Sequence, residues 1–187
     1  MHRSRRWLLG AAPVAVGAAV LRSTDALAAS ARQIDGAANQ ALRNLYAAQP
    51  KARQLGERAK AILIFPKIIK AGLIIGGQGG DGVLRVGGRA DGYYNIAAAS
   101  FGLQAGGQQF SYALFFMNDA AVQYLQKSDG WSIGSGPSVV ALDKGAAASV
   151  TSTTLTEDVY GVPFGQKGLM AGIGLEGSKI TRIHPGP

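Results

Sequence analysis

Glycine interrupts almost every apolar stretch of this chain after Lys70. The sequence has 27 glycines among 187 residues, and the short runs between them are rich in Val, Ile, Phe and Tyr, which favour strands. A glycine inside a strand marks a bend, a bulge or a close backbone approach. Short strands separated by turn signals are typical of antiparallel sheets that curl or close. We therefore predict a curled or barrel-like, glycine-rich antiparallel β-sheet.

The strands of this sheet are predicted at 73–77, 83–86, 93–97, 101–116, 131–142, 148–155, 159–164, 169–175 and 179–183. An earlier apolar run at 61–65 is either a buried strand or the last turn of a helix, and Pro66 is predicted to end it. One helix interrupts the sheet, with Asn118 as its N-cap and Gly130 just after its end.

Two helices are predicted ahead of the sheet. Ile34, Ala38 and Leu45 recur at helical spacing, which indicates an amphipathic helix over about 30–49. Pro50 can then occupy the first turn of a shorter helix that ends near Lys60. The predicted fold class is therefore α+β, a single globular domain. In it, basic helices at 29–60 pack on a β-rich part at 59–187.

Residues 1–28 have the layout of an export signal. Arg5 and Arg6 precede a mildly apolar run that is shorter than the roughly 20 apolar residues of a membrane-spanning helix. The arginine pair indicates a signal of the twin-arginine type, and the small residues at 26–28 predict cleavage before Ala29. We therefore expect an exported protein of the periplasm or outer envelope, associated peripherally with a membrane.

Basic residues are concentrated between Arg32 and Lys70. This segment holds eight basic and two acidic residues, a net charge of +6, whereas the sequence after it is nearly neutral. Such a local excess attracts anionic lipid headgroups, nucleic acid or an acidic partner, and its alternative interpretation is an ordinary solvated helix face. Few aromatic residues lie among the basic ones to stack on bases, and an exported chain does not meet nucleic acid. Nucleic acid is therefore not expected as a partner.

The sequence shows no recognisable metal-binding or nucleotide-binding motif. It has no cysteine, and His184 is the single histidine after the predicted export signal, which argues against a zinc site, a disulfide framework or a histidine-based triad. Two matches to the dinucleotide-binding glycine fingerprint, at 77–82 and 172–177, precede strand-like sequence where the fingerprint needs a helix. We interpret their glycines as turn glycines and expect no cofactor and no metal.

Carboxylate pairs do not suggest catalysis either. Glu157 and Asp158 are adjacent, so as strand neighbours they would point to opposite faces. Asp81 and Asp91 each precede a glycine and are assigned to Asp-Gly turns. The chain is therefore not expected to be an enzyme.

The glycines also form a weak internal echo. Residues 72–78 and 102–108 both read Gly-Leu, two further residues, then Gly-Gly-Gln. The echoes are too unevenly spaced for a repeat architecture, and we interpret them as bent strands.

Four ordered motifs resemble the SYLF domain family: 59–72 running into 76–84, 101–108, Met117–Asn118 and 167–178. The resemblance covers roughly residues 59–180. It implies a non-enzymatic module, since eukaryotic members bind phosphoinositide-rich membranes and some bind actin, while bacterial members are usually exported, stand-alone proteins and often lipoproteins. Without a cysteine to acylate, this chain is expected to contact a membrane reversibly. Without a companion domain, it is not favoured as an actin binder.

The resemblance also implies where a membrane would be contacted, namely the basic N-terminal part and the start of the domain. The candidate lipid-binding residues are Arg53, Arg58, Lys60, Lys67, Ile68, Ile69 and Lys70. The two isoleucines lie between two lysines, so they could enter the acyl boundary while the lysines meet phosphates. The alternative is that both isoleucines belong to the core.

The leading hypothesis is an exported module that binds anionic phospholipid headgroups at a membrane surface. One alternative is an envelope protein that docks another protein, or a second copy of itself, through an apolar glycine-rich surface. Another is a closed barrel with a lipid inside.

Export with cleavage predicts a shortened N-terminus. Sequencing of the protein recovered from the envelope should read from near Ala29, and an intact Met1 there would refute cleavage.

Overall fold

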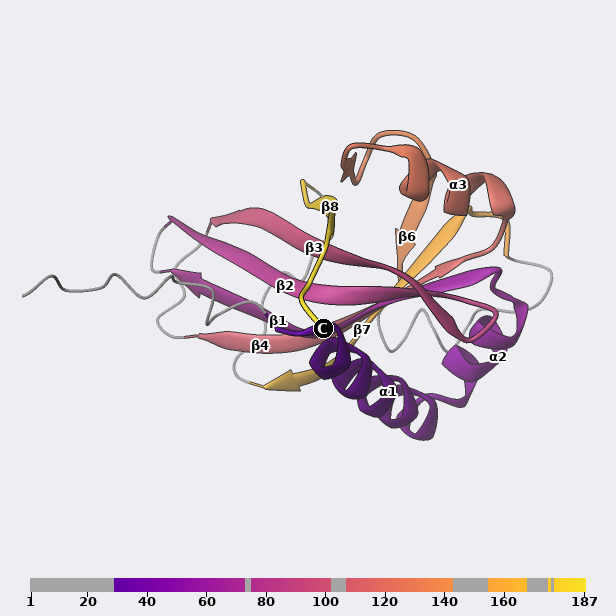
Figure 1. Cartoon of the computed structure of the whole chain (residues 1–187), viewed down its shortest axis with the longest axis horizontal. Coiled ribbons are helices and arrows are strands. Elements are labelled where there is room, and N and C mark those ends of the chain that lie inside the picture. Colours follow the sequence, from indigo (N-terminus) through magenta and orange to yellow (C-terminus); the bar gives the residue numbers. More distant parts are fainter. Residues whose placement is uncertain (1–28, 73–74, 102–106, 143–154, 168–174, 176) are drawn as a thin grey trace, which may run out of the picture.

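The computed structural model describes residues 29–187 except 73–74, 102–106, 143–154, 168–174 and 176 (Figure 1). The predicted export signal lies outside the described residues. The described helices are α1 (Ala31–Ala48), α2 (Pro50–Arg58) and α3 (Asp119–Lys127). The described strands are β1 (Ala61–Gly72), β2 (Ile75–Val86), β3 (Arg89–Phe101), β4 (Gln108–Phe116), β5 (Trp131–Ser132), β6 (Val139–Ala141), β7 (Val159–Lys167) and β8 (Lys179–Ile183).

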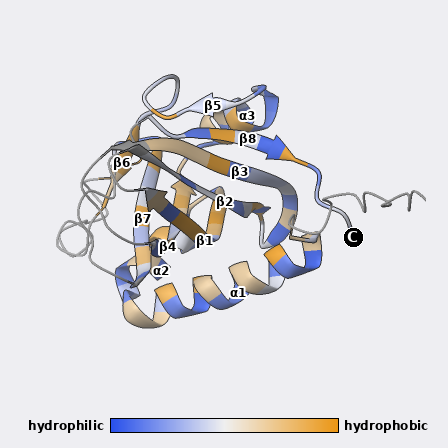
Figure 2. Ribbon diagram, turned by 90° about the vertical axis from the view of Figure 1, so that its left-hand side faces the viewer, coloured by the Kyte–Doolittle hydropathy of each residue, from blue (hydrophilic) through white to orange (hydrophobic). Residues whose placement is uncertain are grey.

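The strands form one sheet in the order β5-β8-β3-β2-β1-β4-β7-β6. Neighbouring strands are antiparallel except for β6 and β7, which pair in parallel, so the sheet is mixed. The sheet curls, with α1 and α2 on one side and α3 on the other (Figures 1 and 2). The α+β class, the curled sheet, the N-terminal helices and the inserted helix are therefore confirmed.

Local capping explains where the helices begin. Ser30 Oγ accepts a hydrogen bond from the Gln33 backbone, and the Gln33 side chain accepts one from the Ser30 backbone, which is a capping box. Pro50 opens α2, where its missing N–H is not needed. The Asn118 side chain accepts a hydrogen bond of 2.8 Å from the backbone N–H of Ala121, so the predicted N-cap of α3 is confirmed.

The central strands are buried on both faces. Along β4, Tyr112, Leu114 and Phe116 join the core beneath α3, whereas Ala113 and Phe115 join the core beneath α1 and α2. We call these two sides of the sheet the α3 face and the helical face. Because both faces are covered, β4 reads as a continuous apolar run without the alternation of a half-exposed strand.

Pro66 does not end the first strand, contrary to the prediction. β1 continues to Gly72, and both of its pairings shift register around Pro66, which places one extra residue in β1 between Phe65 and Ile68. A proline is accepted inside a sheet at such a bulge because it has no ladder hydrogen bond to give. The bulge is fixed by Ser111 Oγ, which donates a hydrogen bond of 2.7 Å to the Pro66 carbonyl.

The interpretation of the first fingerprint as turn glycines is wrong, because Gly77, Gly79 and Gly82 lie inside β2. Asp81 also lies in this strand, where its carboxylate accepts a hydrogen bond of 2.8 Å from Asn95. A true turn follows at Gly87 and Gly88, whose φ angles of 57° and 81° make a tight hairpin to β3. The second fingerprint and the predicted strands 148–155 and 169–175 lie almost wholly outside the described residues.

Close approach of β1 and β2 explains two of the strand glycines. A Cβ at Gly80 would collide with the Lys67 carbonyl oxygen, and one at Gly82 would collide with the Ile64 carbonyl and lie 2.6 Å from Phe65 Cδ1. Both contacts flank the β1 bulge. The glycines are therefore required by the close approach of the two strands at the bend of the sheet.

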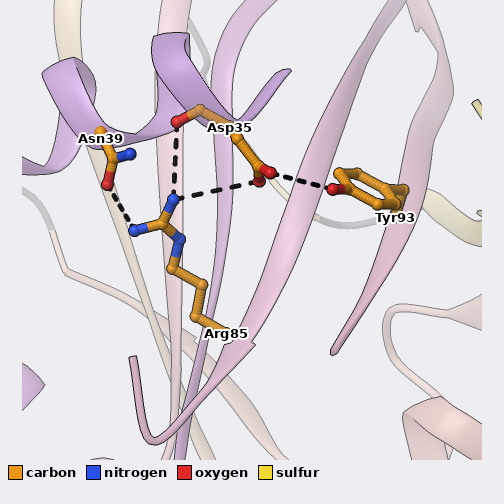
Figure 3. Close-up of polar contacts among 4 residues, drawn as sticks. All are labelled: Asp35, Asn39, Arg85 and Tyr93. Atoms are coloured by element: carbon orange, nitrogen blue, oxygen red, sulfur yellow. Dashed lines mark hydrogen bonds and ion pairs between the residues drawn. The ribbon is translucent and has the colours of Figure 1, made fainter. Parts of the chain in front are cut away.

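A polar cluster docks α1 on the sheet (Figure 3). Tyr93 donates a hydrogen bond of 3.0 Å to the Asp35 carboxylate, and Arg85 donates to the Asn39 side chain and to the Asp35 carbonyl. Burial, followed by the hydrogen bond to Asp35, raises the pKa of Tyr93, so the phenol stays a proton donor. These contacts join α1 to β2 and β3, and an ion pair of 4.0 Å links the Arg85 guanidinium to the Asp35 carboxylate.

Asp158 joins three elements near the β6 edge of the sheet. One carboxylate oxygen accepts from the backbone and side chain of Ser138, and the other accepts from Asn118 at 2.7 Å. The Ser138 backbone N–H and then the Asn118 amide lower the pKa of Asp158 below its ordinary value of 3.8. This carboxylate therefore has a structural role between β6, β7 and the start of α3.

Substitution Gly82→Ala should lower the free energy of unfolding by about 1–3 kcal/mol, the usual cost of overpacking. Gly77→Ala is the matched control on the same strand, since its Cβ would meet the Ala98 carbonyl at an ordinary 3.7 Å. Chemical denaturation measures both, and equal stabilities of the two variants would contradict the close-approach argument.

Substitution Asp158→Asn should lower the melting temperature near neutral pH, because an amide has one acceptor oxygen for two sets of donors. The depressed pKa means that the carboxylate stabilises the fold above pH 3.8, and that this contribution is lost as the pH falls through the lower folded-state pKa. The variant should therefore lose less stability than the parent on acidification. Glu157→Gln, whose carboxylate has no described hydrogen bond, should match the parent at every pH.

Candidate lipid-binding site

Basic side chains project from α2 into solvent. Ala52 and Leu55 are buried beneath the helix, so Arg53 and Arg58 on its other side are exposed. The Arg53 guanidinium lies over the Tyr46 ring at 5.7 Å, which orients it while leaving its charge in water. From Pro50 to Lys60 there are four basic residues and one acidic residue, a net charge of +3.

The β1 bulge separates the two isoleucines of the predicted membrane wedge. Ile68 is fully buried in the α3-face core, whereas Ile69 is 48% exposed. The lysines divide in the same way, because Lys67 is exposed and Lys70 is only 8% exposed. Ile68 therefore belongs to the core, and only Lys67 and Ile69 of this corner reach the surface.

The candidate residues do not form one compact patch. Lys60 and Lys67 lie seven residues apart along an extended strand, which is about 20 Å. The outer side of α1 carries Arg32 and Arg43, both exposed. We call six exposed cations of α1, α2 and the segment 60–67 the basic face: Arg32, Arg43, Arg53, Arg58, Lys60 and Lys67.

Two carboxylates accompany the basic face in these three segments. Asp35 is held by Arg85 and Tyr93 beneath α1 (Figure 3), and Glu57 is exposed on α2. The helical side of the molecule therefore presents an excess of positive charge to whatever approaches it.

A second group of polar residues, which the sequence reasoning missed, lies on the α3 face. Lys70 pairs in register with Gln78 of β2 and with Gln108 of β4, and Gln78 donates a weak hydrogen bond of 3.5 Å to the hydroxyl of Ser178. Lys70, Gln108 and Ser178 are all buried, with 8%, 7% and 0% exposure. We call these four residues the polar row.

The internal echo of the sequence was the signal for this row. Its two copies end in Gln78 and Gln108, and the structure places these glutamines on either side of Lys70. The two glutamines flank Lys70 because β1 lies between β2 and β4, the strands that carry the two copies of the echo. The sequence alone did not give the strand order.

Among the described residues, no group of three or more His, Asp or Glu side chains could hold a metal ion. A shallow pocket of about 360 Å³ lies at the end of α1, lined by Leu45, Gln49 and Phe164 among others. In the same part of the chain, no helix has the length and apolar character needed to cross a bilayer.

Comparison with models of protein families gives one match, to the Ysc84 family, described as Las17-binding protein actin regulator, over residues 97–184. The matched segment begins in β3 and ends just after β8, so it includes Gln108 and Ser178 of the polar row. A search of curated proteins found no match. The match agrees with the motifs read from the sequence at 101–108, Met117–Asn118 and 167–178, which all lie within it. Residues 97–184 of this chain thus match the Ysc84, or SYLF, domain family.

Proposed function

We propose that this protein is an exported, non-enzymatic module that binds anionic phospholipid headgroups through its basic face. The observation that carries the proposal is the placement of six exposed cations on one side of the molecule. SYLF domains are modules of a lipid-binding or actin-binding kind, and the present proposal narrows that description to anionic membrane surfaces.

Charge and exposure favour a membrane surface over a small anionic ligand. The cations are spread along α1, α2 and the segment 60–67 and do not converge on a pocket, as they would around one phosphate. Each Lys or Arg near an anionic bilayer contributes about 1 kcal/mol, and the contribution is screened by salt. Several such contributions add to a reversible, salt-sensitive association.

Ile69 gives the basic face one apolar contact. Its side chain is the most exposed large apolar side chain among the described residues. Ile69 and Lys67 both belong to β1. An exposed aliphatic group beside a lysine suits the boundary between headgroups and acyl chains.

A protein partner is the rival proposal, and the description of the matched family favours it. Exposed large apolar side chains in the described ranges are Ile69, Val86, Tyr124 and Val140. They lie on different elements, so they do not make the continuous apolar patch that marks many protein interfaces. The lipid proposal is therefore preferred.

The double substitution Arg53→Glu and Arg58→Glu should weaken binding to phosphatidylglycerol vesicles about tenfold or more, because four units of charge change near the surface. Co-sedimentation at low and high salt measures the effect. Binding of the parent protein should also fall steeply as salt is raised.

The matched control is Lys127→Glu with Lys179→Glu, which makes the same change in net charge at exposed sites on α3 and β8. This control should bind nearly as the parent does. Equal losses in the two double variants would show that net charge matters and the basic face does not. Absence of vesicle binding by the parent, together with recovery of one stoichiometric protein partner, would favour the rival proposal.

A further inference from the structure

The geometry points to a phosphate-binding site at the polar row, formed by Lys70, Gln78, Gln108 and Ser178 on the α3 face. It goes beyond the proposed function: the row lies on the other face of the sheet from the basic face and takes the phosphate group of a single lipid. Lys70 thereby changes from a surface contact to an interior ligand.

The register of the sheet brings the row together. Gln78, Lys70 and Gln108 are direct cross-strand partners on β2, β1 and β4. All three point to the α3 face, because each is an even number of residues along its strand from an α3-face core residue: Leu84, Ile68 and Phe110 respectively. Adjacent strands lie about 4.8 Å apart, so the three side chains start within about 10 Å of one another.

The row is rich in the donors that a phosphate accepts. Lys70 carries three ammonium donors, and each glutamine amide carries two. Ser178 Oγ accepts from Gln78 Nε2, so its own O–H remains to donate. A cation with neutral donors around it matches the several acceptor oxygens of a phosphate group, and charge-assisted hydrogen bonds of this kind are the strong ones.

The surroundings strengthen electrostatic interactions at the row. The next positions toward the core are Ile68, Phe110 and Ile96, all buried. Tyr112 lies two residues beyond Phe110 in β4. Burial raises the pKa of Tyr112 to about 12, which marks an interior of low polarity.

The row lies near the end of the sheet. Beyond it, the next α3-face positions of β1 and β2 are Gly72 and Gly76, which pair with each other. Gly72 is exposed, so β1 reaches solvent two residues beyond Lys70. Lys70 and Gln108 already have interactions within the protein, so the phosphate binds by exchange with existing contacts.

Two sources of phosphate share this chemistry, a phospholipid headgroup and free inorganic phosphate. The test uses dihexanoyl-phosphatidylglycerol below its micelle-forming concentration, since a monomeric lipid presents no charged surface to the basic face. Inorganic phosphate is titrated in parallel, and both are followed by calorimetry. Lys70→Met should weaken lipid binding about tenfold or more.

Lys127→Met is the matched control, because it makes the same substitution at an exposed position of α3, outside both the polar row and the basic face. It should bind the monomeric lipid as the parent does. If Lys70→Met does not fold by circular dichroism, Gln108→Leu replaces it, with Gln109→Leu, the next residue on the other face of β4, as its control.

The outcomes separate the two proposals. Selective loss on Lys70→Met supports the site, and comparable binding of inorganic phosphate assigns it to free phosphate instead of a headgroup. Equal binding by Lys70→Met and the parent, or no binding of either probe by the parent, overturns the site. In that case, retained salt-sensitive binding to vesicles leaves the proposed function standing, whereas its absence removes that as well.

Discussion

The single extra residue in β1 decides which side chains of the first strand are inside. Without the bulge at Pro66, simple alternation from Leu63 and Phe65 would direct Lys67 and Ile69 to the α3-face core. With it, Ile68 and Lys70 take those positions, and Lys67 and Ile69 reach the surface. The bulge in turn requires the close approach of β2 that only Gly80 and Gly82 permit. The curl of the sheet, the division of the lysines and the separation of two binding surfaces therefore share one origin.

The two buried faces of the sheet are covered by different kinds of residue. The helical face is closed by small and apolar residues of α1 and by the polar cluster of Asp35, Arg85 and Tyr93, which leaves the outer side of the helices free to be basic. The α3 face is filled by aromatic residues at one end and becomes polar at the other. The sheet therefore separates the exposed cations of the basic face from the buried polar row.

The sequence predicted what depends on local signals. The spacing of Ile34, Ala38 and Leu45 predicted the first helix, Pro50 and Asn118 predicted the starts of the other two, and glycines between short apolar runs predicted a bent sheet. It failed at Pro66 and at the glycines of β2, because whether a proline or glycine ends a strand depends on the neighbouring strand. For the same reason it placed Ile68 beside Ile69 in one wedge. The sequence did not predict the polar row, because Gln78, Lys70 and Gln108 become neighbours only through a strand order that local patterns do not encode.

The edges of the sheet bear on how copies of this protein treat one another. The strand at one edge, β5, has two residues, and the strand at the other, β6, has three. An edge this short offers few unpaired backbone groups on which a further strand could grow. A chain so rich in apolar, β-forming sequence would otherwise be prone to aggregate edge to edge at the high local concentrations found on a crowded surface. Among the described residues, edges this short therefore disfavour edge-to-edge association of copies.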